Sequence, residues 1–160
     1  MKRGQGTEPS QALSIALKML RARDRFEAEI RAKCGEKECD EAAVEKAVAF
    51  LRSKGMLHDF RLAAHLAERW TEEKCWGPLR VRAELERRDA PAEAIEDALA
   101  SLPDETETAR RFAARAKSQK PETLARRLSA AGFSEECVLS VAGTSPDRLT
   151  NQEEGHPSSK

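Results

Sequence analysis

Cysteine and histidine are the residue types in this chain best suited to nucleophilic or metal chemistry, and their spacing argues against both. The four cysteines and three histidines are Cys34, Cys39, Cys75, Cys137, His58, His65 and His156. None of them forms the Cys-x-x-Cys or His-x-x-x-His pairs that are typical of zinc sites. We therefore expect no metal and no cofactor, and we expect the cysteines to be thiols.

Catalysis of other kinds has equally little support. Cys75 follows Lys74, so a reactive thiolate is one interpretation, but we favour a small buried hydrophobic residue. The eight glycines are scattered and form no Gly-rich phosphate loop. Acidic residues are plentiful, yet none is singled out by an apolar setting that would tune it for acid–base work. We expect a protein that is not an enzyme.

Charge is balanced overall and segregated locally. The 160 residues contain 28 Lys and Arg against 28 Asp and Glu, and only 4% aromatic residues, which disfavours a surface that stacks bases. Residues 89–108 hold seven acids and no base, whereas residues 110–127 hold seven bases and one acid. We expect a basic side, suited to a phosphate backbone or a charged protein filament. An ordinary solvated helix face is the alternative.

Helices must position these charges, because strand patterns are nearly absent. Apolar residues recur at helical spacing, and capping residues and prolines divide the chain into nine helices. The expected helix starts are Ser10, Asp24 with Glu27 as a capping box, Asp40, Asp59, Pro78, Pro91, Asp104 with Glu107, Pro121 and Ser134.

The nine helices repeat in groups of three. At an offset of 43 the following pairs match without a gap: Pro78 with Pro121, Val81 with Leu124, Leu85 with Leu128, Pro91 with Ser134, and Ile95 with Val138. The first group fits if Phe26 and Ile30 match Val81 and Leu85, with an insertion of four residues near Gly35. We predict an all-α fold of three tandem three-helix repeats in an elongated, curved array, in which each unit gains a core by packing on its neighbour.

The predicted repeats span residues 10–57, 58–103 and 104–143, between flexible tails at 1–9 and 144–160. No segment approaches the roughly 20 apolar residues of a membrane span, and the basic start has no apolar stretch behind it. We expect a cytoplasmic monomer.

Two segments of the central repeat carry a family resemblance. Residues 57–63 (LHDFRLA) and 76–85 (WGPLRVRAEL) resemble the signature of the RecX family of bacterial RecA regulators, and the likeness extends over residues 12–142. Three tandem three-helix units are also that family's architecture. The chain departs from the family pattern at three positions. The family often has a small hydroxyl residue near the position of Phe26 and a Leu near the position of Cys34. It has a Gly at the position of Asp89.

The resemblance implies a protein that binds RecA or its filament on DNA and modulates it, most often by inhibition, in DNA repair and the SOS response, with a weaker contact to DNA. Within that hypothesis the partner-binding residues are Arg61, Arg69, Lys74, Arg80, Arg82, Arg87, Arg88, Arg110, Arg111, Arg115, Arg126 and Arg127. Two alternatives remain: a helix-turn-helix protein that binds DNA directly, and a helical scaffold for an unrelated protein.

Overall fold

The computed structural model describes residues 10–116 and 120–144, so the predicted tail at 1–9, and all of the predicted tail at 144–160 except residue 144, lie outside the described part of the chain. That part contains nine helices: α1 (Gln11–Ala22), α2 (Glu27–Glu36), α3 (Glu41–Ser53), α4 (Asp59–Lys74), α5 (Pro78–Arg87), α6 (Ala92–Ala100), α7 (Glu105–Arg115), α8 (Pro121–Ala130) and α9 (Glu135–Ala142).

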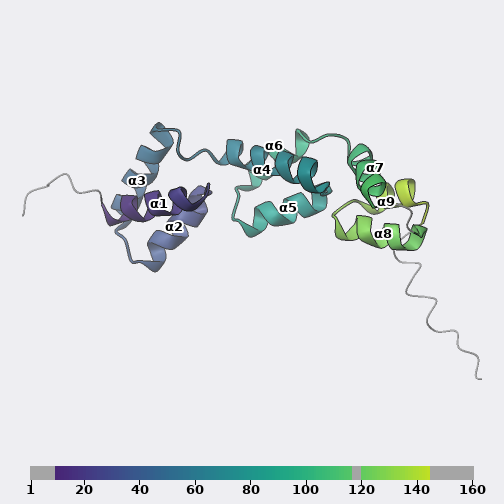
Figure 1. Cartoon of the computed structure of the whole chain (residues 1–160). Coiled ribbons are helices and arrows are strands. Elements are labelled where there is room, and N and C mark those ends of the chain that lie inside the picture. The colour runs from purple at the N-terminus through teal and green to yellow at the C-terminus, as the bar shows by residue number, and fades with distance from the viewer. Residues whose placement is uncertain (1–9, 117–119, 145–160) are drawn as a thin grey trace, which may run out of the picture.

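The helices form three successive groups in an elongated row (Figure 1). Helices α1–α3 make the first unit, α4–α6 the second and α7–α9 the third, which confirms the prediction of three tandem three-helix repeats. Over residues 10–116 and 120–144 there is no strand. Among these same residues no helix has the length and apolar character needed to cross a membrane.

Local sequence signals account for the N-terminal starts of most helices. The Ser10 hydroxyl accepts from the Leu13 amide at 3.2 Å, and the Ser134 hydroxyl accepts from the Cys137 amide at 3.3 Å. Asp104 likewise accepts from the Thr106 and Glu107 amides at 3.1 and 3.3 Å. These bonds satisfy amides that have no partner inside their own helix. Prolines begin α5 and α8 as predicted.

At three helix starts the role of the predicted residue differs from the prediction. Helix α2 is capped by Phe26, whose amide donates to the Glu29 carboxylate at 2.8 Å, so the predicted Asp24 capping box is displaced by two residues. Helix α4 is capped by His58, whose Nδ1 accepts from the Arg61 amide at 3.1 Å. Asp59 is the first residue of α4 and not its cap, and its carboxylate accepts from the amide of Glu27, in the first unit, at 3.0 Å. Pro91 precedes α6 instead of beginning it.

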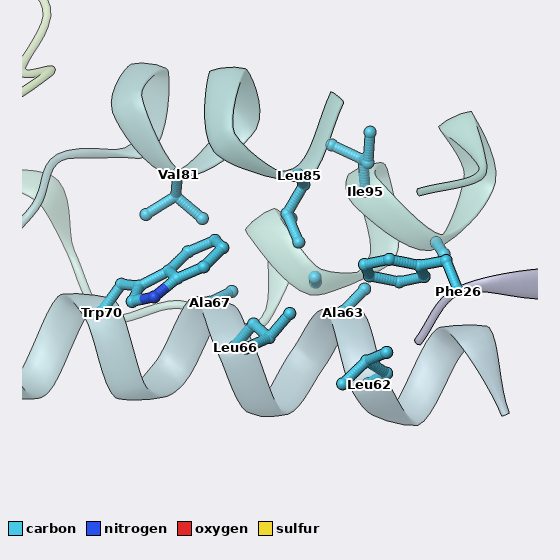
Figure 2. Close-up of a cluster of buried hydrophobic side chains, with 11 residues drawn as sticks. Phe26, Leu62, Ala63, Leu66, Ala67, Trp70, Val81, Leu85 and Ile95 are labelled. Atoms are coloured by element: carbon cyan, nitrogen blue, oxygen red, sulfur yellow. The ribbon is translucent and has the colours of Figure 1, made fainter. Parts of the chain in front are cut away.

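Buried side chains form three separate clusters, one for each group of helices. The prediction that units share cores with their neighbours is therefore wrong, with one exception. Phe26, from the first unit, is fully buried in the cluster of the second unit. Figure 2 shows its ring among Leu62, Ala63, Leu85 and Ile95. Leu99 packs against the same cluster and is partly buried, whereas other apolar residues at helical spacing in this unit are buried in it: Leu62, Leu66, Trp70, Val81, Leu85 and Ile95.

The first two units correspond without an insertion. Helices α5 and α6 begin 51 residues after α2 and α3, respectively. Ile30 and Cys34 therefore match Val81 and Leu85, and all four are buried. The predicted match of Phe26 with Val81 is wrong because Phe26 lies before its helix and belongs to the next core. A side chain that leaves its own unit breaks the internal pattern of that unit.

Asp89 has a φ of +58°, in the left-handed region where glycine is favoured. This backbone position explains why a glycine is common there in the family that the sequence resembles. Aspartate is one of the few other residues that tolerate this conformation.

Candidate partner-binding surface

Backbone groups join the second and third units. The Gly77 amide donates to the Ala131 carbonyl at 2.8 Å, and the Leu79 amide donates to the Gly132 carbonyl at 3.0 Å. A Cβ at Gly77 would come closer than 3.0 Å to the Gly132 carbonyl, and one at Gly132, whose φ is +92°, would meet the backbone of Arg80. Only glycine permits this approach at either position.

Arginines reinforce the same junction at helix C-termini. Arg111 donates to the Glu72 carbonyl at 3.2 Å, and Arg115 donates to the Glu73 carbonyl at 3.0 Å, both at the end of α4. The carbonyls of a last helical turn lack partners within the helix and carry partial negative charge, so cations are favourable there. These two predicted partner-binding residues therefore bind the chain's own backbone.

Three cations and two aromatic rings lie beside this junction and form what we call the junction cluster: Lys74, Trp76, Arg80, Phe112 and Arg127. Lys74 Nζ lies 4.4 Å and Arg80 Cζ 4.1 Å from the centroid of the Trp76 ring. Arg127 Cζ lies 5.5 Å from the centroid of Phe112. These are cation–π distances, and such contacts hold a cation in place while leaving its charge available.

The junction cluster borders a hollow of about 180 Å³, whose remaining lining includes Ala130 and Ala131. Arg80 also donates to the Ala130 carbonyl at 3.4 Å. The hollow therefore has an apolar floor, formed by rings and alanines, and a cationic rim. It brings Lys74 and Arg80 together with Arg127, which follows Arg80 by 47 residues in the sequence.

Of the other predicted cations, Arg69, Arg82 and Arg87 lie in ion pairs at the surface, and Arg61, Arg110 and Arg126 do not. Arg82 pairs with Glu96 across α5 and α6, a contact that raises the pKa of Arg82 and lowers that of Glu96. Arg87 pairs with Glu84 at 2.9 Å, and Arg69 lies 4.0 Å from Glu73. Arg61 donates to the Gly55 carbonyl at 2.8 Å. Arg110 and Arg126 are exposed and have no hydrogen-bond or ion-pair partner within the described ranges.

Arg88 lies between the first and second units instead of on an open face. Its guanidinium donates to the Asp24 carbonyl at 2.9 Å, lies 3.8 Å from the Glu29 carboxylate, and has its Cζ 5.5 Å from the centroid of Phe26. Burial lowers the pKa of Arg88. Its geometry is that of a residue that fastens two units together.

Two important residues were missed by the sequence reasoning. Phe112 received no role, although it forms one wall of the hollow. Phe26 was assigned to the wrong core. A signal existed for Phe26, since a large apolar residue stands where the resembled family often has a small hydroxyl residue. For Phe112 no local signal existed, because its importance comes from Arg127, 15 positions away.

The observed helices refine the expected charge pattern. Helix α6 contains Glu93, Glu96 and Asp97 and no base, and α9 contains acids and no base, whereas α3 is mixed. Acidic third helices are therefore a feature of the second and third units only.

Metal and thiol chemistry find no support in the geometry. No cluster of three metal-ligating side chains exists among the residues that the structure describes. Cys34, Cys75 and Cys137 are buried free thiols, as predicted for Cys75. Burial raises the pKa of Cys34 and of Cys137, which disfavours the thiolate form of these two residues.

Comparison with known proteins agrees with this architecture. Residues 12–51 match the family model described as RecX, first three-helix domain. The chain is 32% identical over 148 residues to the regulatory protein RecX of Leptothrix cholodnii, an alignment that covers 88% of this chain and 90% of the relative. The chain belongs to the RecX family. It is also 31% identical to the regulatory protein RecX of Geobacillus kaustophilus, over 84% of this chain but only 54% of that longer relative.

Solved RecX structures share the fold. A crystal structure of regulatory protein RecX superimposes with a TM-score of 0.68 at 22% identity, covering 84% of this chain and 72% of the other. RecX from Lactobacillus salivarius gives a TM-score of 0.71 at 17% identity, covering 83% and 93%. The fold of this chain is therefore shared with two solved RecX structures at low sequence identity.

Proposed function

We propose that this chain binds RecA, free or as a filament on DNA, and inhibits its ATPase, recombinase and co-protease activities. The observation that carries the proposal is the 32% identity to a regulatory protein RecX over 88% of this chain and 90% of the relative. In this role the chain acts by binding and has no catalytic step. Its setting is the cytoplasm, in DNA repair and the SOS response.

The elongated row of units supports binding along another extended object. A row joined by specific junctions presents its surface at fixed spacing, so it contacts several protomers of a filament at once. Contact at several protomers gives strong inhibition at substoichiometric amounts.

We divide the twelve predicted cations by their observed contacts. Arg88, Arg111 and Arg115 bond to the backbone of neighbouring units, so they support the shape of the row. The cations that we expect to contact the partner are the others without a carboxylate partner in the described part of the chain, including Arg61 and Arg80, which also donate to the Gly55 and Ala130 carbonyls. They are Arg61, Lys74, Arg80, Arg110, Arg126 and Arg127.

The test is ATP hydrolysis by RecA of the same organism on single-stranded DNA while this chain is titrated from far below stoichiometry to equality. Loss of hydrolysis well below equality is the expected result and indicates capping or occupation of the filament. An unchanged rate, with this chain shown to be folded by circular dichroism, contradicts the proposal.

A charge-reversal pair locates the surface. Arg126→Glu with Arg127→Glu is expected to weaken inhibition by about tenfold, because two exposed cations of α8 become anions. The matched control is Lys18→Glu with Lys46→Glu, which makes the same change in net charge at exposed positions of the first unit. Equal inhibition by both variants would exclude α8 as a contact surface.

A parallel titration of this chain with duplex DNA, without RecA, tests the alternative of direct DNA binding. Binding to duplex DNA with a steep salt dependence would favour a helix-turn-helix role, since each neutralised phosphate releases counterions.

A further inference from the structure

We propose that the hollow at the junction cluster docks a short acidic segment of the partner protein, with one leucine or aromatic side chain of that segment seated between Trp76 and Phe112. This inference rests on the proposed function, because it assumes that the chain acts by binding a regulated protein. It goes beyond that function by naming the docking site and the chemistry of what it takes.

The charge of the hollow is the first argument. Eight arginines of the described residues have a carboxylate within 4.0 Å: Arg23, Arg25, Arg31, Arg52, Arg69, Arg82, Arg87 and Arg88. Lys74, Arg80 and Arg127 have none among the same residues and lie instead against aromatic rings. Three cations without carboxylate partners around one small hollow create a local positive potential, and carboxylates of a partner complement it.

The size and lining of the hollow are the second argument. The hollow has a volume of about 180 Å³ and is bordered by the half-buried Trp76, by Phe112 and by the buried Ala131. A cavity of roughly 150 Å³ with apolar walls accommodates a benzene ring, so this hollow has room for one large side chain. A buried apolar anchor surrounded by charged contacts is the usual form of a binding hot spot, and tryptophan and arginine are its most enriched residues.

The aromatic rings favour a peptide over single-stranded nucleic acid. Base stacking needs an open ring face. The Trp76 ring has two cations within 4.4 Å of its centroid, and Trp70 lies at 5.6 Å from it on the core side. Phe112 has Arg127 on one side and packs edge-on against Phe133 at 6.2 Å. Side-chain anchoring between the rings needs only their edges, whereas stacking needs the faces that the cations already occupy.

Intrinsic fluorescence reads the site directly. The chain has two tryptophans, Trp70 and Trp76, and no tyrosine, so emission reports this region of the molecule. The probe is a capped pentapeptide Asp-Glu-Leu-Glu-Asp, which contains no fluorophore. Its matched controls are Asp-Glu-Ala-Glu-Asp, which lacks the anchor, and Lys-Lys-Leu-Lys-Lys, which reverses the charge.

The Leu peptide is expected to change the emission with a Kd of roughly 0.1 to 1 mM, as suits a single small anchor. The Ala peptide is expected to bind about tenfold more weakly, and the Lys peptide not to bind. Arg127→Glu is expected to weaken the Leu peptide by about tenfold, because it places an anion on the rim. Lys46→Glu, with the same change in charge far from the hollow in sequence and in unit, leaves the Kd unchanged.

Each remaining outcome decides between the two proposals. No response to the Leu peptide, in a chain that does inhibit RecA, overturns the docking site and leaves the proposed function in place. Peptide binding that Arg127→Glu weakens, in a chain without effect on RecA, supports the docking site and removes RecA as its partner. Inorganic phosphate or oligothymidylate that binds more tightly than the Leu peptide, and is lost in Arg127→Glu, shows a phosphate site and overturns the proposal.

Discussion

The two junctions between the three units depend on different kinds of contact. Between the first and second units the contacts come from side chains: the buried Phe26 ring, the Asp59 carboxylate and the Arg88 guanidinium. Between the second and third units the central contacts are backbone hydrogen bonds of Gly77 and Leu79. The first junction therefore depends on apolar burial and on charge, whereas the second depends on the absence of side-chain atoms.

This difference separates the ways in which the array can be disturbed. Truncation of Phe26 or a change of pH acts on the first junction, and addition of a single methyl group at Gly77 acts on the second, which the Arg111 and Arg115 side chains also brace. The junction cluster lies beside the junction between the second and third units. A partner bound there therefore contacts the junction whose central bonds contain no ionisable group.

The largest effect is expected for Phe26→Ala. The substitution removes a fully buried ring from the second core and is expected to cost about 3 to 5 kcal/mol of unfolding free energy. Amide hydrogen exchange measured helix by helix should accelerate in α4–α6 and change little in α7–α9. Phe50→Ala is the control, since Phe50 is 44% exposed, and its cost is expected below about 1 kcal/mol. Faster exchange confined to α1–α3 would contradict the assignment of Phe26 to the second core.

An intermediate effect is expected for Gly77→Ala. Gly77 has a φ of −76°, which alanine adopts without strain, so the cost comes only from its Cβ against the Gly132 carbonyl. We expect a loss of about 1 to 3 kcal/mol in urea unfolding and an altered small-angle scattering profile, because the two units must move apart. Gly35→Ala adds the same methyl group inside α2 with no atom within 4 Å, and is expected to stabilise by about 0.5 to 1 kcal/mol. A Gly77→Ala variant with wild-type stability and scattering would show that the junction is not held by close approach.

The smallest effect is expected for Asp59→Asn, and it depends on pH. Burial raises the pKa of Asp59 above its unfolded value, so the ionised carboxylate is disfavoured in the folded chain. Its contribution to stability therefore decreases as the pH rises through the interval between the unfolded and the raised folded pKa. Asparagine keeps an oxygen acceptor for the Glu27 amide and removes the charge.

We expect Asp59→Asn to be slightly more stable than wild type at pH 7, by less than about 1 kcal/mol, with the difference disappearing below about pH 4. Chemical unfolding of both proteins across this range measures it, and the difference between them cancels the titration of other groups. Asp59→Ala, which removes the acceptor as well, is expected to be destabilised at every pH. A stability deficit of Asp59→Asn that persists in acid would show that the negative charge itself holds the junction.

Much of the fold was predictable because its determinants are local. Ser10, Ser134, Pro78 and Pro121 begin their helices through contacts within four residues, and sequence patterns report such contacts well. The capping error at Asp59 has the opposite origin. Its carboxylate accepts a hydrogen bond from an amide 32 residues away, and no local sequence pattern reports such a distant contact.

The candidate surface was predictable in composition and not in arrangement. Lys74, Arg80 and Arg127 were predicted along with Arg88 and Arg115, since all are cations at helical spacing. The structure separates them by place: the first three border one hollow beside aromatic rings, whereas Arg88 and Arg115 donate to backbone carbonyls of the preceding unit. An arginine has the same local pattern in either case.

The sequence by itself determined the helical class, the threefold repetition and the family, because periodicity, caps and motif order are properties of neighbouring residues. Only the tertiary structure decided that Phe26 belongs to the second core, that Gly77 and Gly132 approach each other, and which cations remain without carboxylate partners. Each of these facts depends on residues more than 30 positions apart or on a choice among several acids, and burial and chain geometry settle them when the units come together.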